Sequence, residues 1–259
     1  MNREPFRHLL DFAVEVAWRA GRVALAHYQT GISAQIKPDA SPVTEADRGA
    51  ELLVRDLIET RFPHDGIVGE EFGTVRPDAA RRWILDPIDG TRTFVRGVPL
   101  FGCLLALEED NEPVIGVMYF PALEETVCAA RGEGAWFNGR RALVSDVTSM
   151  DDALVLTTDV AAIERQGYSK GWNRLRSRAG LVRTWGDCYG HALVATGRAE
   201  VMLDPIMSLW DAAALKPIVD EAGGIFTSWD GAATHTGGSA VSTNTALARE
   251  VRTLLTGQP

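Results

Sequence analysis

The sequence predicts an α+β fold in which helices and sheets lie in layers. Three observations support this prediction. Up to about residue 61, apolar residues recur at steps of three and four, which is typical of amphipathic helices. Between residues 100 and 130, short apolar runs are separated by turn residues, which is typical of antiparallel strands. After residue 150, short strands alternate with helical segments, so the second half mixes both kinds of element.

The elements of the first half follow from these patterns and from local turn and capping signals. Thr44 and Asp47 have the spacing of a capping box, which predicts the start of a helix. Asn138-Gly139 is typical of a tight hairpin. In chain order we expect a helix over 6–28 ended by Gly31, a turn containing Pro38, Asp39 and Pro42, a helix over 44–61, a strand over 66–69, strands over 100–107, 114–119 and 125–130, and hairpins at 132–134 and 138–139.

The second half is expected to form a further lobe with a tight interface to the first. We place the boundary near Ser145, giving an N-terminal α+β lobe over 1–145 and a C-terminal α/β lobe over 146–259 within one compact unit. No repeat or low-complexity linker separates the two. In chain order we expect strands over 153–156, 181–183, 200–203, 225–227 and 240–242, and helices over 163–178, 188–196, 212–222 and 246–255.

Composition argues against several classes of function. The net charge of −9 argues against nucleic acid as a partner, because phosphate backbones are bound by basic faces. No apolar run approaches the roughly 20 residues that span a bilayer, and Met1 to His8 lack the pattern of a secretion signal. Cys103, Cys128 and Cys188 lie singly in apolar stretches, which indicates core residues in a reducing compartment. We therefore expect a cytoplasmic protein with no membrane partner.

A short apolar strand ending at Asp86 runs into an acidic turn. Asp89 follows three residues later, and Pro87 stiffens the bend between the two carboxylates. Gly90 permits a tight turn, and Thr91 is expected to begin a helix. Carboxylate oxygens suit Mg²⁺, and a helix N-terminus accepts an anion such as phosphate. The alternative is that Asp-Pro and Asp-Gly are ordinary turn pairs.

Four acidic residues are expected at strand ends or helix starts: Glu70, Asp86, Asp89 and Asp211. Carboxylates gathered in one pocket repel one another, so such a site needs divalent cations. Ligation by oxygen alone favours Mg²⁺ or Mn²⁺ over zinc. The five histidines are scattered and form no HExxH pattern, so a zinc hydrolase is disfavoured.

Other phosphatase and hydrolase chemistries lack their motifs. The sequence contains neither a GxxxxGK[ST] loop nor a GxSxG elbow. Haloacid-dehalogenase phosphatases use a DxDGT motif, in which the two carboxylates are two residues apart. Asp86 and Asp89 are three apart, which favours metal-activated water over an aspartyl-phosphate intermediate.

Three motifs in order resemble the inositol monophosphatase family. They are Gly69-Glu70-Glu71, then Asp86-Pro87-Ile88-Asp89-Gly90-Thr91, then Trp210-Asp211 with Glu221-Ala222-Gly223-Gly224. The resemblance extends over nearly the whole chain. It implies a layered αβαβα sandwich of the inositol monophosphatase and fructose-1,6-bisphosphatase type. It also implies hydrolysis of a small phosphate monoester with two or three Mg²⁺ ions, or with Mn²⁺.

The resemblance also implies a role for each matching residue. The metal ligands would be Glu70, Asp86, Asp89, Asp211 and the carbonyl of Ile88. Gly90 and Thr91 would bind phosphate through backbone N–H groups. Thr91, with Glu70 or Asp47, would orient the attacking water. Asp47 also suits a helix N-terminal turn, and Asp211 also suits a helix N-cap, so these readings stay open.

The substrate prediction rests on the second lobe. The stretch from Arg183 to Tyr189 departs from the small-residue pattern of enzymes that act on inositol phosphates. Asp187, and Asp204 seven residues before Asp211, place negative charge near the leaving group, where a cationic group would pair with it. Together with Ser41 to Arg48, this pattern is similar to the histidinol-phosphate phosphatases of the family.

We therefore expect L-histidinol phosphate as the substrate, with Asp187, Asp204 and Arg183 as substrate-binding residues. The alternatives are an inositol 1-phosphate or broad sugar-phosphate phosphatase, a nucleotide 3′-phosphatase, and a non-catalytic family member. Asp187 could instead be only a helix cap. Because members of the family are often dimers, we also expect a homodimer.

Overall fold

The structure, a computed structural model, describes residues 6–31, 33–37 and 42–257. Three residues named in the sequence analysis lie outside the described residues: Pro38 and Asp39 of the expected turn, and Ser41 of the stretch from Ser41 to Arg48. The helices are α1 (Arg7–His27), α2 (Glu45–Arg61), α3 (Thr91–Val95), α4 (Val160–Arg165), α5 (Ser169–Arg176), α6 (Cys188–Ala195), α7 (Leu209–Ala212), α8 (Leu215–Glu221), α9 (Ala248–Thr256) and a 3₁₀ turn (Met150–Asp152). None of these helices is long and apolar enough to cross a membrane.

The larger sheet has eight strands in the order β10-β9-β8-β7-β6-β5-β3-β4. Strands β5 to β10 each pair antiparallel with the next, which confirms the expected meander. Only β3 and β5 run parallel within this sheet's described pairings. Its strands are β3 (Gly66–Gly69), β4 (Gly73–Val75), β5 (Arg81–Asp89), β6 (Gly102–Glu109), β7 (Glu112–Phe120), β8 (Glu125–Ala130), β9 (Gly134–Phe137) and β10 (Arg140–Ala142).

The smaller sheet has five strands in the order β12-β11-β13-β15-β14. β11 runs parallel to both β12 and β13, whereas β15 runs antiparallel to its neighbours. Its strands are β11 (Leu154–Thr157), β12 (Leu181–Arg183), β13 (Val201–Asp204), β14 (Ile225–Thr227) and β15 (Ala240–Thr243). A separate two-stranded ribbon pairs β1 (Gln35–Ile36) with β2 (Pro42–Val43).

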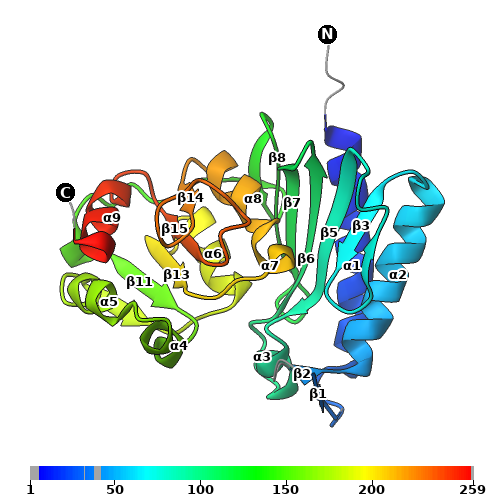
Figure 1. The fold of residues 1–259 in the computed structure, drawn as a ribbon, viewed down its shortest axis with the longest axis horizontal. Helices are drawn as coiled ribbons and strands as arrows, with labels where there is room; N and C mark the ends of the chain where they lie inside the picture. Colours follow the sequence, from blue (N-terminus) through cyan, green and yellow to red (C-terminus); the bar gives the residue numbers. More distant parts are fainter. Residues whose placement is uncertain (1–5, 32, 38–41, 258–259) are drawn as a thin grey trace.

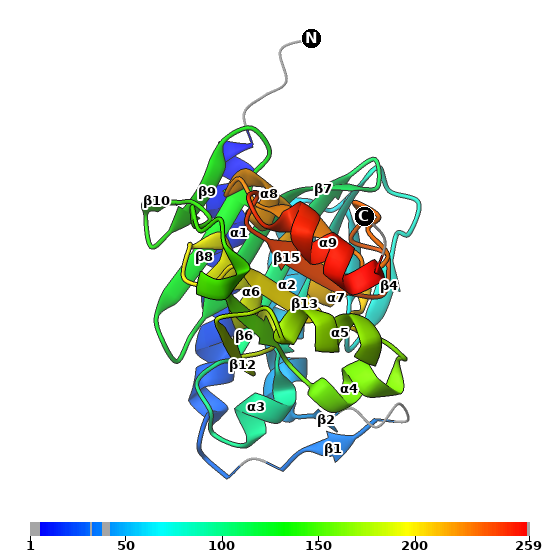
Figure 2. The ribbon, with the colours of Figure 1, turned by 90° about the vertical axis from the view of Figure 1, so that its left-hand side faces the viewer.

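Alternating burial along the strands creates the layers. On β5, Trp83 and Leu85 pack with α1 and α2, whereas Ile84 packs on the opposite face with α6, α7 and α8. The other side of α6 packs against Leu156 and Met202 of the smaller sheet. The far face of that sheet is covered by α5 and α9. Figure 1 shows the resulting αβαβα order from left to right, and Figure 2 looks onto α4, α5 and α9. The expected sandwich is confirmed.

Some expected boundaries are wrong, for local reasons. The first helix ends at His27, not at Gly31, because Tyr28 is extended and its hydroxyl donates to the Gly97 carbonyl at 2.5 Å. The sequence predicts one helix over 163–178, but Gly167 adopts a φ of +79° and separates α4 from α5. The strand β4 lies in a segment where no strand was expected.

The helix expected over 212–222 is also two helices. It begins earlier, at Leu209, and is divided between α7 and α8. Pro217 has no N–H to donate to the carbonyl four residues before it, which prevents a continuous helix through Ala213. The division matters for the site, because α7 is the element that carries Asp211.

The middle layer, formed by α6, α7 and α8 of the second half, also packs on the sheet of the first half. All strands of the larger sheet precede residue 145, and all strands of the smaller sheet follow residue 150. However, α8 packs tightly on β7: a Cβ added at Gly116 would lie 2.1 Å from the Ala214 carbonyl oxygen. A glycine is therefore required at this crossing. The lobe boundary near Ser145 stays a prediction, since this helix of the second half covers the sheet of the first.

Candidate active site

The acidic turn leaves the larger sheet at the end of β5. Alternation places Asp86 on the same face as Ile84, toward the middle layer. The pairing of β5 with β6 shifts register between Asp86 and Asp89, so the chain bends there. The backbone N–H of Ile88 donates to Asp86 Oδ1 at 2.9 Å, which fixes this carboxylate.

Asp89 joins the turn to the second half of the chain. Its Oδ2 accepts the backbone N–H of Cys188, the first residue of α6, at 2.6 Å. In the same way, Asp211 Oδ2 accepts the backbone N–H of Ser208 at 2.7 Å, in the pattern of a capping box. One oxygen of each carboxylate is thus fixed by the backbone.

The carboxylates of Asp86, Asp89 and Asp211 form one cluster, with one oxygen from each lying within 4.8 Å of the others. Burial, together with the negative charges of Glu70, Asp89 and Asp211, raises the pKa of Asp86 well above its ordinary value. Burial and the charges of Asp187 and Asp211 likewise raise the pKa of Asp89. Burial, with the charge of Glu70, raises the pKa of Asp211 to about 7. A hard divalent cation would relieve this repulsion and fits the oxygen-only donor set.

Glu70 and Glu71 follow β3 and lie beside this cluster. The Lys37 ammonium donates to Glu70 Oε1 at 2.7 Å and to Glu71 Oε1 at 2.6 Å. Burial would lower the pKa of Lys37, but the hydrogen bonds and charges of the two glutamates outweigh it and raise the pKa. Sequence reasoning did not single out Lys37, because its partners are more than 30 residues away along the chain.

Asp47 and Thr91 meet behind the acidic turn. Asp47 Oδ2 accepts from the backbone N–H of Thr44 at 2.7 Å and from its hydroxyl at 2.5 Å, which confirms the capping box. The Thr91 hydroxyl lies 3.0 Å from the Ile88 carbonyl oxygen and 3.3 Å from Asp47 Oδ1. Burial raises the pKa of Asp47, and the charge of Glu70 adds to the rise.

The loop expected to bind phosphate lies next to Asp187. Gly90 has a φ of +82° and precedes α3, so the backbone N–H of Thr91 is at a helix N-terminus. Asp187 Oδ2 accepts the Thr93 hydroxyl at 2.7 Å and would lie 2.9 Å from a Cβ at Gly90. Asp187 is the N-cap residue of α6, but its side chain makes no capping hydrogen bond with the described residues. The interpretation of Asp187 as only a helix cap is therefore wrong.

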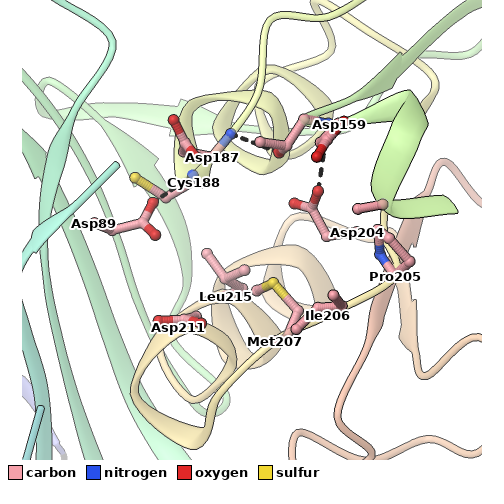
Figure 3. Close-up of a pocket in the computed structure, with 12 residues that line it drawn as sticks. Asp89, Asp159, Asp187, Cys188, Asp204, Pro205, Ile206, Met207, Asp211 and Leu215 are labelled. Carbon is pink, nitrogen blue, oxygen red and sulfur yellow. Dashed lines mark hydrogen bonds between the residues drawn. The ribbon is translucent and has the colours of Figure 1, made fainter. Parts of the chain in front are cut away.

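A pocket of about 160 Å³ opens beside the carboxylate cluster. In Figure 3, Asp89 and Asp211 lie at one end and Asp204 and Asp159 at the other. Of the expected substrate residues, Asp187 and Asp204 line the pocket. Arg183 is exposed on β12, is not among the described residues that line the pocket, and donates to the Val182 carbonyl at 2.8 Å.

Several lining residues were missed from the sequence: Thr158, Asp159, Ala162, Pro205, Ile206, Met207 and Leu215. A signal for some of them exists. β11 and β13 are adjacent parallel strands, so their carboxyl ends meet at one edge of the sheet, where ligands commonly bind. Thr158 follows β11, and Pro205 follows Asp204 at the end of β13. The sequence alone did not reveal that these two strands are neighbours.

Fold and site together define a phosphatase in which acidic side chains from two halves of a layered sandwich surround one pocket. Residues 6–256 match the inositol monophosphatase family, and the chain belongs to this family. It is 46% identical to a histidinol-phosphatase of Chlorobaculum parvum over 93% of this chain and 94% of that protein. It is 32% identical to an inositol-1-monophosphatase of Rhizobium meliloti over 95% and 96% of the two chains.

Solved structures agree with this assignment. An inositol monophosphatase from Zymomonas mobilis superimposes with a TM-score of 0.88 at 32% identity, covering 98% of this chain and 99% of that one. The enzymes of the family use divalent metal ions, and the acidic cluster described above supplies the matching donors.

Proposed function

We propose that this phosphatase hydrolyses L-histidinol phosphate with the aid of Mg²⁺. The observation that supports this substrate is the pair of acidic side chains, Asp187 and Asp204, in a pocket that already contains Asp89 and Asp211. A neutral polyol does not need the extra carboxylates, whereas the ammonium and imidazole of histidinol would pair with them. The similarity to a histidinol-phosphatase supports the same substrate.

Glu70, Asp86, Asp89, Asp211 and the Ile88 carbonyl would hold two or three Mg²⁺ ions. When bound, Mg²⁺ would activate a water molecule and neutralise the charge that develops on the leaving oxygen. Asp86, Asp89 and Asp211 each use one oxygen to accept a backbone N–H, and each has a second oxygen that a cation would ligate. The backbone N–H groups of Gly90 and Thr91 would bind the phosphate.

The proton of the attacking water would pass to Thr91 and Asp47. The water oxygen forms the new bond to phosphorus as the ester P–O bond breaks. The water gives a proton to Thr91 Oγ1, whose own proton moves to Asp47 Oδ1 at 3.3 Å, and the leaving alkoxide takes a proton from solvent. This contact supports Asp47 rather than Glu70 as the partner of Thr91, because Lys37 engages Glu70. Burial raises the pKa of Asp47, which makes this carboxylate a stronger proton acceptor.

The test compares kcat/KM for L-histidinol phosphate and for inositol 1-phosphate with Mg²⁺. We expect a preference of about a hundredfold for histidinol phosphate, or about 2.7 kcal/mol. Asp187→Ala should raise KM for histidinol phosphate far more than KM for inositol 1-phosphate. Preference for the inositol ester would leave the family assignment intact and favour the second candidate, an inositol 1-phosphate or broad sugar-phosphate phosphatase, which the relative from Rhizobium meliloti supports.

Location and assembly follow from other features. We propose a cytoplasmic location, which is supported by the free thiols of all three cysteines. We also propose a homodimer. The edge strand β12 pairs with β11 alone among the described strands. Leu181 on this strand and Trp185, which follows it, are 41% and 43% exposed.

A further inference from the structure

A buried histidine lies directly behind one of the acidic residues of the pocket. His191 is fully buried on α6, and its Nε2 lies 3.2 Å from Asp204 Oδ2. Its Nδ1 lies 2.7 Å from the hydroxyl oxygen of Ser242, which is also fully buried. The steps assigned so far to the metal, the phosphate and the attacking water use neither side chain.

The fold explains how these three residues meet. His191 lies in the first turn of α6, the helix that Asp187 precedes. On the facing sheet, Met202 of β13 pairs with Ser242 of β15, and Asp204 follows Met202 by two residues. Asp204 and Ser242 therefore point to the same face, and His191 bridges them.

The hydrogen bonds have one direction that satisfies every atom. An ionised carboxylate only accepts hydrogen bonds, so His191 must carry a hydrogen on Nε2 to donate to Asp204. Nδ1 of a neutral imidazole then accepts from the Ser242 hydroxyl. Because the imidazole is neutral, it fixes one oxygen of Asp204 without cancelling the negative charge that this carboxylate presents to the pocket. The other oxygen lies 3.4 Å from the backbone N–H of Thr158.

We propose that His191 is a positioning residue for substrate recognition: it fixes the Asp204 carboxylate so that this carboxylate receives the cationic part of the substrate. This inference rests on the proposed function, because it assigns Asp204 to the leaving group. Asp204 is only 5% exposed, so its rotation would be decided by the groups behind it. Without a donor at Nε2, the carboxylate would lose a charge-assisted hydrogen bond and its defined orientation.

The first experiment determines the tautomer. Long-range ¹⁵N–¹H spectra of protein labelled on histidine need to resolve only five residues. We expect a neutral His191 with its hydrogen on Nε2. A hydrogen on Nδ1 alone, or a doubly protonated ring that cancels the charge of Asp204, would overturn the inference.

The second experiment separates positioning from a structural role. His191→Leu removes the donor, whereas His191→Gln keeps an amide N–H near the position of Nε2. Relative to wild type, His191→Leu should raise KM for histidinol phosphate about tenfold and leave KM for inositol 1-phosphate within about threefold. His191→Gln should restore most of the preference. Should the Leu variant not fold, Ser242→Ala, which removes the donor to Nδ1, is expected to move the same KM ratio in the same direction.

His235 provides a matched control. It is buried like His191 and its Nε2 lies 2.5 Å from the carboxylate of Glu108, but neither residue lines the pocket. His235→Gln should leave the ratio of the two KM values unchanged.

A wild-type enzyme without preference for histidinol phosphate would contradict the proposed function, while the tautomer of His191 would still test its hydrogen bond to Asp204. A clear wild-type preference with identical KM ratios in His191→Leu and wild type would overturn the inference alone.

Discussion

At the scale of single residues, two aspartates cap a helix and also belong to the proposed site. Asp47 Oδ2 accepts the backbone N–H of Thr44, and its Oδ1 accepts the hydroxyl of Thr91. Asp211 Oδ2 accepts the backbone N–H of Ser208, and the same carboxylate belongs to the acidic cluster. The sequence leaves a cap and a site residue as alternatives. The structure makes them compatible, because a carboxylate has lone pairs for both.

Residue-level prediction from sequence succeeds where partners are close along the chain. The capping box at Thr44 and Asp47, and the turn between Asp86 and Asp89, depend on spacings of three residues. It fails where partners are distant. Thr93 and Asp187 are 94 residues apart, and no local pattern predicts their hydrogen bond.

Asp86→Asn should stabilise the metal-free protein at alkaline pH. The raised pKa values of the cluster mean that the folded state binds more protons than the unfolded state between about pH 4 and the folded pKa, which is about 7 for Asp211. Stability of the metal-free wild type therefore falls as pH rises through this window. An asparagine removes one negative charge and keeps the oxygen that accepts from Ile88.

Thermal unfolding in EDTA from pH 5 to pH 8 measures this effect. At pH 8 the variant should unfold about 3 °C or more above wild type, and Mg²⁺ should stabilise wild type but not the variant. Its activity should fall at least about a hundredfold. A variant that is less stable than wild type in EDTA, or that Mg²⁺ still stabilises fully, would remove Asp86 from the proposed metal site.

At the scale of elements, one buried contact ties the loop before β15 to the larger sheet. Glu108 on β6 accepts from Arg82 on β5 at 2.6 Å and meets His235 at 2.5 Å. From the same loop, the Gly238 carbonyl accepts the backbone N–H of Met207, which lines the pocket. The His235–Glu108 contact therefore ties this loop to the larger sheet, whereas the pocket-lining Met207 is held by a separate backbone hydrogen bond.

Glu108→Gln should destabilise the protein by about 2 kcal/mol at neutral pH. Burial would raise the pKa of Glu108, but hydrogen bonds and charges from His235 and Arg82 outweigh it and lower the pKa. The carboxylate thus stabilises the fold above its unfolded pKa of about 4.3, and this contribution is lost as pH falls through the lower folded pKa. Urea unfolding of both proteins should differ above pH 5 and converge below pH 4.

A neighbouring substitution controls for the loss of one charge. Glu109→Gln should change the free energy of unfolding by no more than about 0.5 kcal/mol, because Glu109 is only partly buried at the strand end. A Glu108→Gln variant that matches this control, or a difference from wild type that does not depend on pH, would show that the charge of Glu108 is not stabilising.

Element-level prediction was accurate for the meander and for most helices. Periodicity sufficed for α1, α2 and β6 to β8, where long regular runs leave little choice. It failed at short breaks. Pro217 is visible in the sequence, but a proline is tolerated in the first turn of a helix, so its presence alone did not predict that α7 and α8 are separate.

At the scale of the whole molecule, the layers bring the acidic cluster together from distant parts of the chain. Asp86 and Asp89 end a strand of the larger sheet, whereas Asp211 belongs to α7 between the two sheets. The order of motifs predicted this sandwich through the family resemblance. Composition and periodicity alone predicted only mixed layers, because they do not reveal which strands are neighbours.

The most direct test of the account locates metal and phosphate in the protein itself. Crystals soaked in MnCl₂ and inorganic phosphate would give anomalous peaks at each bound Mn²⁺. We expect peaks about 2.0–2.3 Å from carboxylate oxygens of Asp86, Asp89 and Asp211, with phosphate against the N–H groups of Gly90 and Thr91. Phosphate bound elsewhere, or Mn²⁺ absent from these three carboxylates at saturating concentration, would contradict the central claim that this cluster is the metal centre of the phosphatase.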